Sequence, residues 1–561
     1  MAVLPAVSLL ERLDHWRRVQ PDQQMIIEYD VYASRTTGKP VRRGTITWNE
    51  FWNKVIALGA ALRQHGVSPG DVVAIQLPTW HEYFAAQMAG YAVGAIIMPI
   101  SPIFRSRDVA RQLTLGKARV YVVPAAYGNF DFVGMARALR DELSSLEHII
   151  VVGDNAPADT LKWSDLLAQG SGADAAAERE RIASGSCVLP LNSFSLFNFT
   201  SGTTGDPKGV MHSTVTMHAA VSGAATRMQL THDDILFVAV TLGHAGGFLN
   251  GIFMPLHLGA TVVYMDLWDA DVALHLVERE RITYGPAMPT FLFDLANHPD
   301  FGKVDISSWR VVRVSGGAIT RSLMASLQER LPHLRLCPGW GMSEALYVTA
   351  ASPDDTAEKR NLTEGKPLDG FQLTIRDATF TRDLPQGQLG ELLIKTPSVM
   401  LGYWGQEALT KAAYTADGWL KTGDLGFFDP DGFLVIGGRS KELIIRGGEN
   451  VPIVDVQNLL GEHDNVASAV LVGVPDPRLG EKVCAVVERK DASRPFTLEE
   501  MRAFLVQKQL TRQFIPEYLV LTDALPRTAV GKVKLHEVRA LALSMTNRVP
   551  VASHNGSTAQ A

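Results

Sequence analysis

The sequence predicts an α/β protein built from a large unit and a small unit. Short β-branched runs alternate with helical stretches along most of the chain, a pattern typical of βαβ units and mostly parallel sheet. The chain has 561 residues, which exceeds the roughly 100–200 residues of one ordinary domain. The alternation changes character near residue 437, where a glycine pair and basic residues separate the two units.

The elements of the large unit follow from the hydrophobic pattern. Residues 1–20 predict an amphipathic first helix, and residues 82–95 predict a helix rich in small side chains. Strands are expected at 72–77, 96–100, 120–123, 148–152, 235–240, 261–265 and 310–314. Between 371 and 436 the segments become short and are divided by turns, which favours a smaller antiparallel module.

The small unit begins after the boundary at 437–441 (GGRSK). Helices are expected at 455–462 and 497–508, and strands at 467–472 and 482–488. About 100 residues of this kind can fold independently. We therefore predict a large N-terminal domain at 1–438, a small C-terminal domain at 439–545 and a flexible tail at 546–561.

Composition excludes several classes of function. A formal charge of -6 gives no basic surface for nucleic acid. Cys187, Cys337 and Cys484 are far apart, so neither a disulfide framework nor a metal site with cysteine ligands is expected. No apolar run reaches about 18 residues, so we expect no stable membrane insertion, and the absence of a secretory pattern predicts the cytoplasm. The sequence leaves the oligomeric state open, a homo-oligomer included.

The most informative segment is 200–209 (TSGTTGDPKG). An apolar run at 194–199 precedes it, and we interpret 210–220 as a helix. A strand, a glycine-rich loop and a helix together point backbone N–H groups at an anion. A polar surface turn is the alternative, because Gly, Ser, Thr and Pro favour turns. The density of glycines, hydroxyls and a lysine favours a triphosphate loop formed by Thr200, Ser201, Gly202, Thr203, Thr204, Gly205 and Lys208.

This loop has neither the Walker A nor the G-x-G-x-x-G spacing. It resembles the phosphate-loop signature of the adenylate-forming superfamily, which includes acyl-CoA synthetases, peptide-synthetase adenylation domains and luciferases. Five later segments resemble further signatures of that superfamily in its order: 315–318 (SGGA), 339–344 (GWGMSE), 421–425 (KTGDL), 438–441 (GRSK) and 526–532 (PRTAVGK). Each alone could be a turn or a solvated surface segment, so the order of all six supports the resemblance.

The resemblance implies a role for each matching residue. It implies a large domain of two parallel-sheet subdomains and a small β module, with a small mobile α+β C-terminal domain. Trp340 would lie against adenine, Asp424 would bind the ribose, and Lys532 would be the catalytic lysine on the small domain. Mg²⁺ would bind Glu344 and Thr200, because it prefers oxygen ligands. Further nucleotide-binding positions would be Gly317, Ala318, Gly339, Gly341, Met342, Ser343, Arg439 and the hinge residue Lys441, while Lys208 would neutralise the departing diphosphate.

Two other segments concern the acid and the acyl acceptor. The segment 447–450 (GGEN) resembles the loop on the coenzyme A side of acyl-CoA synthetases, with Gly447, Gly448 and Glu449 near the pantetheine. The segment 240–248 (VTLGHAGGF) resembles the one beside the acyl pocket. His244 would lie at the carboxylate end, although a hydrogen-bonded core histidine is the alternative, and Gly246 and Gly247 would make room for the chain.

The predicted reaction converts a carboxylic acid, ATP and coenzyme A into acyl-CoA, AMP and diphosphate through an acyl-adenylate. The apolar segment 236–239 argues against an amino acid substrate, and the region 446–460 resembles bacterial ligases for medium-chain and alicyclic acids. A medium-chain, alicyclic or aromatic acid is therefore expected. The alternatives are an acyl-AMP ligase that loads a separate carrier protein, a luciferase-like oxygenase and a non-catalytic nucleotide-binding module.

Overall fold

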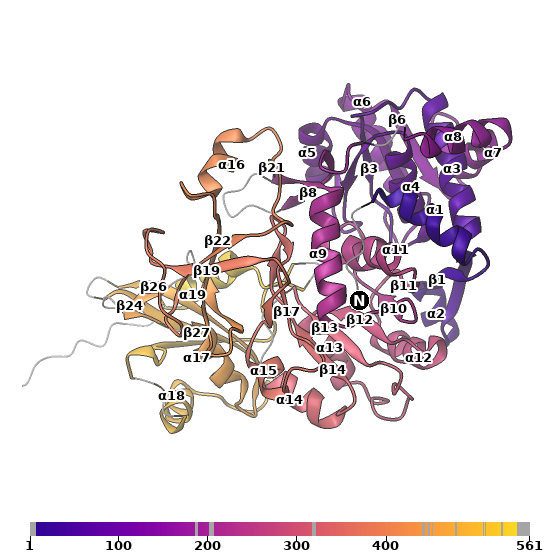
Figure 1. Cartoon of the computed structure of the whole chain (residues 1–561). Helices are drawn as coiled ribbons and strands as arrows, with labels where there is room; N and C mark the ends of the chain where they lie inside the picture. The colour runs from indigo at the N-terminus through magenta and orange to yellow at the C-terminus, as the bar shows by residue number, and fades with distance from the viewer. Residues whose placement is uncertain are drawn as a thin grey trace, which may run out of the picture.

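The structure is a computed structural model of the 561-residue chain. It describes residues 7–185, 189–200, 207–316, 321–439, 444–446, 449–451, 453–476, 479–508, 510, 512–528 and 531–546. Across these ranges the chain forms two large sheets, a small antiparallel sheet and a C-terminal sheet with its own helices (Figure 1). The α/β prediction is confirmed. No helix in these ranges is long and apolar enough to cross a membrane.

The first sheet contains the strands that directly precede the predicted nucleotide-binding segments 315–318 and 339–344. Its order over the described residues is β14-β13-β12-β10-β11-β1-β2, parallel except for the antiparallel pair β1 and β2. The strands are β1 (Gln24–Asp30), β2 (Val41–Thr47), β10 (Ile235–Val238), β11 (Thr261–Met265), β12 (Tyr284–Ala287), β13 (Val311–Val314) and β14 (Arg335–Pro338).

The second sheet contains the phosphate-loop hairpin at one edge. Its order, again over the described part of the chain, is β21-β9-β8-β4-β3-β5-β6-β7, with antiparallel pairing only at β8, β9 and β21. The strands are β3 (Val72–Ile75), β4 (Ile96–Pro99), β5 (Ala118–Pro124), β6 (His148–Val152), β7 (Leu161–Lys162), β8 (Phe194–Thr200), β9 (Lys208–Ser213) and β21 (Gly402–Tyr403).

Helices cover both faces of each large sheet, which explains the continuous apolar runs of their strands. The largest core joins the inner faces of both sheets to α1 (Leu9–Val19), α3 (Trp48–Gln64), α4 (His81–Ala92), α9 (Thr214–Arg227), the π-helix η1 (Leu249–Phe253) and α11 (Met254–Leu258). The outer face of the first sheet packs against α12 (Ala270–Glu280), α13 (Pro289–Ala296) and α14 (Arg321–Arg330). The outer face of the second packs against α5 (Ser106–Gly116) and α6 (Phe132–Glu142).

Local capping fixes where several helices begin. The Ser8 hydroxyl accepts a bond from the Glu11 backbone N–H and starts α1, and Thr47 does the same with Glu50 for α3. The first helix expected within residues 1–20 is confirmed from Leu9 to Val19. The remaining helices of this region are α2 (Val31–Thr37), α7 (Trp163–Gln169), α8 (Ala173–Ala183), α10 (Ala245–Phe248), α15 (Ala357–Leu362) and α16 (Glu407–Ala413).

The helix expected at 210–220 is wrong in its first half. Residues 208–213 form β9, which pairs with β8 on one side and β21 on the other. The helix α9 starts only at Thr214, because the Ser213 hydroxyl caps it by accepting from the Thr216 backbone N–H. The phosphate loop therefore connects two antiparallel strands, and its backbone does not lead directly into a helix.

The antiparallel module expected at 371–436 is confirmed. Its described strands are ordered β19 (Gln372–Arg376), β20 (Gly390–Lys395), β22 (Leu420–Phe428) and β23 (Leu434–Arg439). Two short hairpins, β15 (Gly341–Met342) with β16 (Leu346–Tyr347) and β17 (Thr349–Ala350) with β18 (Lys366–Pro367), connect it to the first sheet. Leu392, Ile394 and Leu434 of the module belong to the largest core.

The C-terminal unit has its own sheet and cores. The sheet contains β24 (Ile445–Arg446), β25 (Glu449–Asn450), β26 (Val466–Asp476), β27 (Gly480–Arg489) and β28 (Tyr518–Thr522). One face packs against α17 (Ile453–Gly461) and α18 (Leu498–Gln507), and the other against α19 (Leu535–Thr546). A short 3₁₀ turn, η3 (Arg512–Phe514), precedes β28, and α17 contacts β23 and α14 of the larger part.

Candidate active site

The phosphate loop is held at both of its ends. Thr200, the last residue of β8, pairs with Lys208, the first residue of β9. The Trp404 backbone N–H donates to the Gly209 carbonyl at 2.8 Å, and the Trp404 ring lies parallel to the Phe197 ring at 5.7 Å. These contacts anchor the hairpin to the edge strand β21. The predicted loop residues Ser201, Gly202, Thr203, Thr204 and Gly205 lie outside the described residues.

Tyr403, which the sequence analysis did not identify, contacts both Lys208 and Glu344. The Lys208 Nζ lies 5.2 Å from the centre of the Tyr403 ring, and the Tyr403 hydroxyl donates to Glu344 Oε1 at 2.9 Å. Burial, together with the charge of Glu344, raises the pKa of Tyr403, so its hydroxyl stays protonated and remains a donor. A tyrosine between a glycine and a tryptophan carries no sequence signal for this role.

The adenine motif 339–344 lies at the carboxyl end of the first sheet. The Gly339 N–H donates to the Val314 carbonyl at 3.1 Å, which sets this motif beside the segment that follows β13. A Cβ on Gly341 would lie 2.0 Å from the Leu346 carbonyl oxygen, so the hairpin of β15 and β16 requires glycine there. Gly317 and Ala318, expected among the nucleotide-binding positions, lie outside the described residues.

A buried histidine fixes the middle of this motif. His212 of β9 contacts the Ser343 carbonyl oxygen through Nε2 at 2.7 Å, so Nε2 carries the proton. Its other nitrogen lies 3.1 Å from the Thr216 hydroxyl, and burial lowers the pKa of His212 to about 4. The phosphate-loop hairpin is thereby tied to the adenine motif. Sequence reasoning missed His212 because nothing local distinguishes it from a core residue of a strand.

Trp340 and Asp424 come together from motifs 84 positions apart. The indole Nε1 donates to Asp424 Oδ2 at 2.8 Å, and both residues are buried. The Trp340 backbone N–H donates to the Thr349 hydroxyl at 2.9 Å, so the backbone of Trp340 is held as well as its ring. Asp424 also pairs across the sheet with Arg439. The ring expected against adenine and the carboxylate expected at the ribose are therefore neighbours.

His244 and Lys532 interact electrostatically, although they are far apart in the chain. His244 keeps exposed surface, yet enough protein encloses the ring to lower its pKa to about 4, first by burial and then by the charge of Lys532. The exposed surface of His244 argues against a packed core histidine. Lys532 is held by a turn in which its backbone N–H donates to the Thr528 hydroxyl at 3.1 Å. A Cβ on Gly531 would meet Thr290 Oγ1 at 3.3 Å, so this turn touches α13.

The two glycines after His244 have different surroundings. A Cβ on Gly246 would meet only His244 Nδ1, at 3.9 Å, so this residue borders free space. A Cβ on Gly247 would lie 1.8 Å from the Thr241 carbonyl oxygen. The expectation that both glycines make room for the acid is therefore wrong for Gly247, which allows α10 to fold back onto the preceding turn.

A buried polar cluster lies behind Gly246. Asn250 Nδ2 donates to the Gly246 carbonyl at 2.7 Å and bonds the Tyr347 hydroxyl, while the Tyr284 hydroxyl donates to Asn250 Oδ1 at 2.7 Å. The Arg313 guanidinium lies 3.9 Å from the centre of the Tyr347 ring. These residues come from η1 and three separate strands, so no sequence motif reveals them. The interior next to the expected acyl site is therefore partly polar.

The remaining predicted residues are only partly described. Arg446 pairs with Glu449 in the short hairpin of β24 and β25, next to the expected coenzyme A loop. Gly447 and Gly448 of that loop and the hinge residue Lys441 lie outside the described residues. The described residues thus bring Lys208 to Glu344, Trp340 to Asp424, and His244 to Lys532.

Comparisons with known proteins show which family the chain belongs to. The model of the AMP-binding enzyme family matches residues 13–404, and the model of the AMP-binding enzyme C-terminal domain matches residues 455–532. A medium-chain fatty-acid–CoA ligase of Escherichia coli is 31% identical, over 93% of this chain and 88% of its own. A 3-[(3aS,4S,7aS)-7a-methyl-1,5-dioxo-octahydro-1H-inden-4-yl]propanoyl:CoA ligase of Mycobacterium tuberculosis is 33% identical, over 94% and 98%.

A solved structure is similar along nearly the whole chain. The amide bond synthetase McbA from Marinactinospora thermotolerans has a TM-score of 0.80 and 28% identity, covering 95% of this chain and 99% of its own. The fold, the order of the motifs and the matched family models all agree. The chain belongs to the AMP-binding enzyme family, and it is a ligase of the adenylate-forming superfamily.

Proposed function

We propose that this enzyme is an acyl-CoA synthetase. It joins a carboxylic acid to ATP to form an acyl-adenylate and diphosphate, and then transfers the acyl group to coenzyme A with release of AMP. The acid is of medium chain length, alicyclic or aromatic. The observation that supports the proposal best is the electrostatic interaction of Lys532 with His244, together with the contacts that join Lys208, Tyr403 and Glu344.

The first step brings two anions together. A carboxylate oxygen attacks the α-phosphorus, and the bond from that phosphorus to the bridging oxygen breaks, so that the electron pair leaves with diphosphate. The charge of Lys532 is suited to offset the repulsion between the acid and the α-phosphate, and that of Lys208 is suited to the departing diphosphate. Positioned cations in a partly enclosed cleft act strongly on such a step. At neutral pH His244 is uncharged, because its pKa is about 4, so it serves as a hydrogen-bonding wall.

The residues present suit a magnesium ion. Glu344 offers a carboxylate held by Tyr403, and Thr200 offers a hydroxyl at the end of the phosphate loop. Both are hard oxygen donors of the kind that Mg²⁺ prefers. When bound there, the ion would supply positive charge to the phosphates.

The second step transfers the acyl group to a thiol. The sulfur of coenzyme A attacks the acyl carbonyl carbon, and the mixed-anhydride bond breaks to release AMP. Of the cysteines in the described residues, Cys337 and Cys484 are fully buried, and burial raises the pKa of each to about 12. Neither is a nucleophile for this step, which supports an external thiol.

The acid is proposed from the surroundings of Gly246 and from the named relatives. The free space beside Gly246 gives the chain room, and the buried cluster around Asn250 makes the protein interior behind it partly polar. The Escherichia coli relative is named for a medium-chain fatty acid, and the Mycobacterium tuberculosis relative for an oxygenated bicyclic propanoate. A relative from Aromatoleum aromaticum, 30% identical, is named for indoleacetate.

A pyrophosphate-release screen tests the reaction and the acceptor. Acids of medium chain length, alicyclic acids, aromatic acids and keto acids are supplied with ATP and Mg²⁺, with and without coenzyme A. We expect acid-dependent release that coenzyme A accelerates, together with acyl-CoA detected by mass. The likeness to an amide bond synthetase supports an amine as a second candidate acceptor, and a separate carrier protein would be a third. Release that ignores coenzyme A, with no acyl-CoA formed, would reject the proposed acceptor.

The role of Lys532 has a matched control two residues away. Lys532→Ala should lower adenylate formation by about 100-fold or more, because a positioned charge at the reacting centre is lost. Thioester formation from supplied acyl-AMP should change little. Lys534→Ala should behave like the wild type, since Lys534 Nζ only pairs with Glu537 at 2.8 Å on the surface. Equal activity of the two variants in pyrophosphate release would remove Lys532 from the mechanism.

A further inference from the structure

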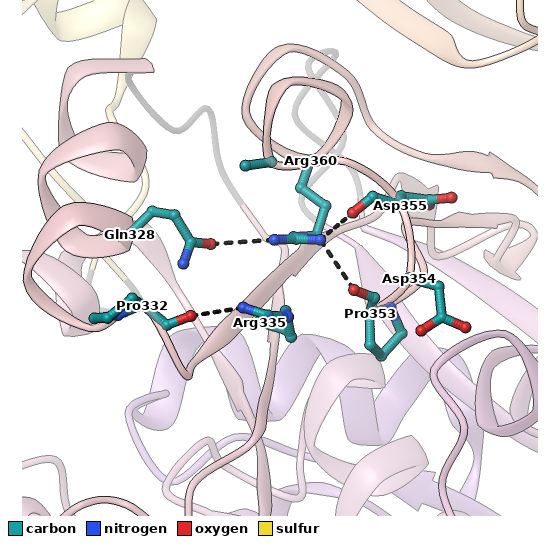
Figure 2. Close-up of a pocket in the computed structure, with 8 residues that line it drawn as sticks. Gln328, Pro332, Arg335, Pro353, Asp354, Asp355 and Arg360 are labelled. Carbon is teal, nitrogen blue, oxygen red and sulfur yellow. Dashed lines mark hydrogen bonds between the residues drawn. The ribbon is translucent and has the colours of Figure 1, made fainter.

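A cavity of about 570 Å³ lies at the amino end of β14, away from the adenylation motifs. We call it the arginine pocket, and it is lined by Gln328, Pro332, Arg335, residues 353–355, Ala357 and Arg360 (Figure 2). The adenine motifs follow the carboxyl ends of β13 and β14. The pocket therefore lies at the amino ends of these strands and the candidate active site at their carboxyl ends, about 10 Å or more away along the strand.

Two guanidinium groups dominate this pocket. Arg360 of α15 is only 4% exposed, and it donates to the Pro353 carbonyl at 3.0 Å, to the Asp355 carbonyl, and to Gln328 Oε1 at 3.4 Å. Its Nε makes no hydrogen bond. Arg335, which is half-buried, donates to the Pro332 carbonyl at 2.6 Å. Among the described residues, neither arginine has a carboxylate partner (Figure 2).

The acids of the pocket are engaged elsewhere. Both carboxylate oxygens of Asp355 accept from Arg227 Nη2, at 2.9 and 3.1 Å, so this pair is neutral. Asp354 accepts from Gln229 Nε2. The lining itself holds two arginines and two aspartates, and Arg227 pairs with Asp355 from outside the lining, so these five side chains together keep an excess of one positive charge. Burial, and to a smaller extent the charge of Arg335, lower the pKa of Arg360, as expected for two neighbouring cations.

A buried cation without a counter-ion is costly, and a bound anion removes that cost. We propose that the arginine pocket binds a phosphate-bearing small molecule. Guanidinium groups match the oxygens of phosphate in charge and geometry, and two of them together suit a doubly charged phosphate. The volume exceeds what inorganic phosphate needs, so an organic phosphate or diphosphate fits the space. The lining offers no aromatic ring for a base, which argues against recognition of a nucleobase.

The test separates this pocket from the phosphate loop. Titration calorimetry is carried out in a Lys208→Ala background, which weakens phosphate binding at the candidate active site. Inorganic phosphate, diphosphate and glycerol 3-phosphate are the three probes, at matched ionic strength. We expect saturable binding of at least one of them. Adding Arg335→Gln should weaken that binding by about tenfold or more, because a charge-assisted hydrogen bond is lost.

A matched control and two outcomes decide the proposal. Arg382→Gln removes the same charge from an exposed arginine of the antiparallel module and should leave binding unchanged. Arg335 is the main variant because it is half-buried and bonds one carbonyl, so its loss should not unfold the protein. The relative affinities of the three probes identify the source of the phosphate. No binding by any probe in the Lys208→Ala background would overturn the proposal, and so would binding that Arg335→Gln leaves intact.

Discussion

The variant Tyr403→Phe removes one hydroxyl group and should impair the positioning of Glu344 while leaving the other contacts of the site unchanged. In the structure this hydroxyl donates to Glu344 Oε1 at 2.9 Å, while the ring lies under Lys208 Nζ at 5.2 Å. Phenylalanine keeps the ring and its contact with the ammonium group. The substitution therefore deletes one charge-assisted hydrogen bond and leaves the cation–π contact in place.

The expected size of the effect follows from that bond. A hydrogen bond to a charged group contributes about 1.5–3 kcal/mol. If it holds Glu344 in the orientation that the transition state needs, its loss should lower kcat/KM for ATP by about 10- to 150-fold. Burial and the charge of Glu344 raise the pKa of Tyr403, so the hydroxyl stays protonated at any working pH. The ratio of wild-type to variant activity should therefore be constant between about pH 6 and pH 9.

The assay is pyrophosphate release at varied ATP and Mg²⁺, with thermal melting as a check on folding. Tyr414→Phe is the matched control, because its hydroxyl donates only to the Met400 carbonyl, at 3.3 Å, in the same neighbourhood. We expect Tyr414→Phe to keep kcat/KM within about threefold, since one weak neutral hydrogen bond is lost. Tyr403→Phe with wild-type kinetics, or equal losses in the two variants, would refute the role assigned to Tyr403.

Two further predictions concern stability and the acid. Burial lowers the pKa of His212 from 6.5 to about 4, so the unfolded chain binds a proton at this residue more tightly than the folded chain does. The free energy of unfolding should therefore fall by up to about 3 kcal/mol as the pH falls from 6.5 to 4. His212→Gln, which keeps a donor toward Ser343, should flatten that part of the stability profile in urea unfolding, and an unchanged profile would contradict the assignment. Gly246→Ala should fold normally and disfavour bulky acids in the pyrophosphate screen, because its Cβ enters the space beside His244. An identical acid profile for wild type and Gly246→Ala would argue against an acyl site beside Gly246. Gly247→Ala should instead melt several degrees lower, because its Cβ would lie 1.8 Å from a backbone carbonyl oxygen.

Much of the fold could be predicted because its signals are local. Parallel strands that are covered on both faces need continuous apolar runs, so β5 and β6 are visible in the sequence. The antiparallel module and the helices α17 and α18 were also predicted correctly, because closely spaced turns and helical periodicity are local signals too. The error at 210–220 shows the limit of such signals. Whether 208–213 becomes strand or helix depends on pairing with β21, nearly 200 residues away, which no local pattern contains.

The sequence by itself predicted which chemical groups the site contains, and it determined the family. The order of its motifs named Lys208, Glu344, Trp340, Asp424 and Lys532, because phosphate, adenine and ribose each require side chains in short, recognisable arrangements. The sequence could not determine how these groups support one another.

Only the tertiary structure decided those contacts. Tyr403 reaches Glu344 across 59 positions, and Trp340 reaches Asp424 across 84. The different roles of Gly246 and Gly247 depend on which atoms lie within 4 Å of each, and the arginine pocket depends on α14, β14 and α15 meeting. A hydrogen bond or a steric contact acts over a few ångströms in space, whatever the separation along the chain, so these features exist only once the chain has folded.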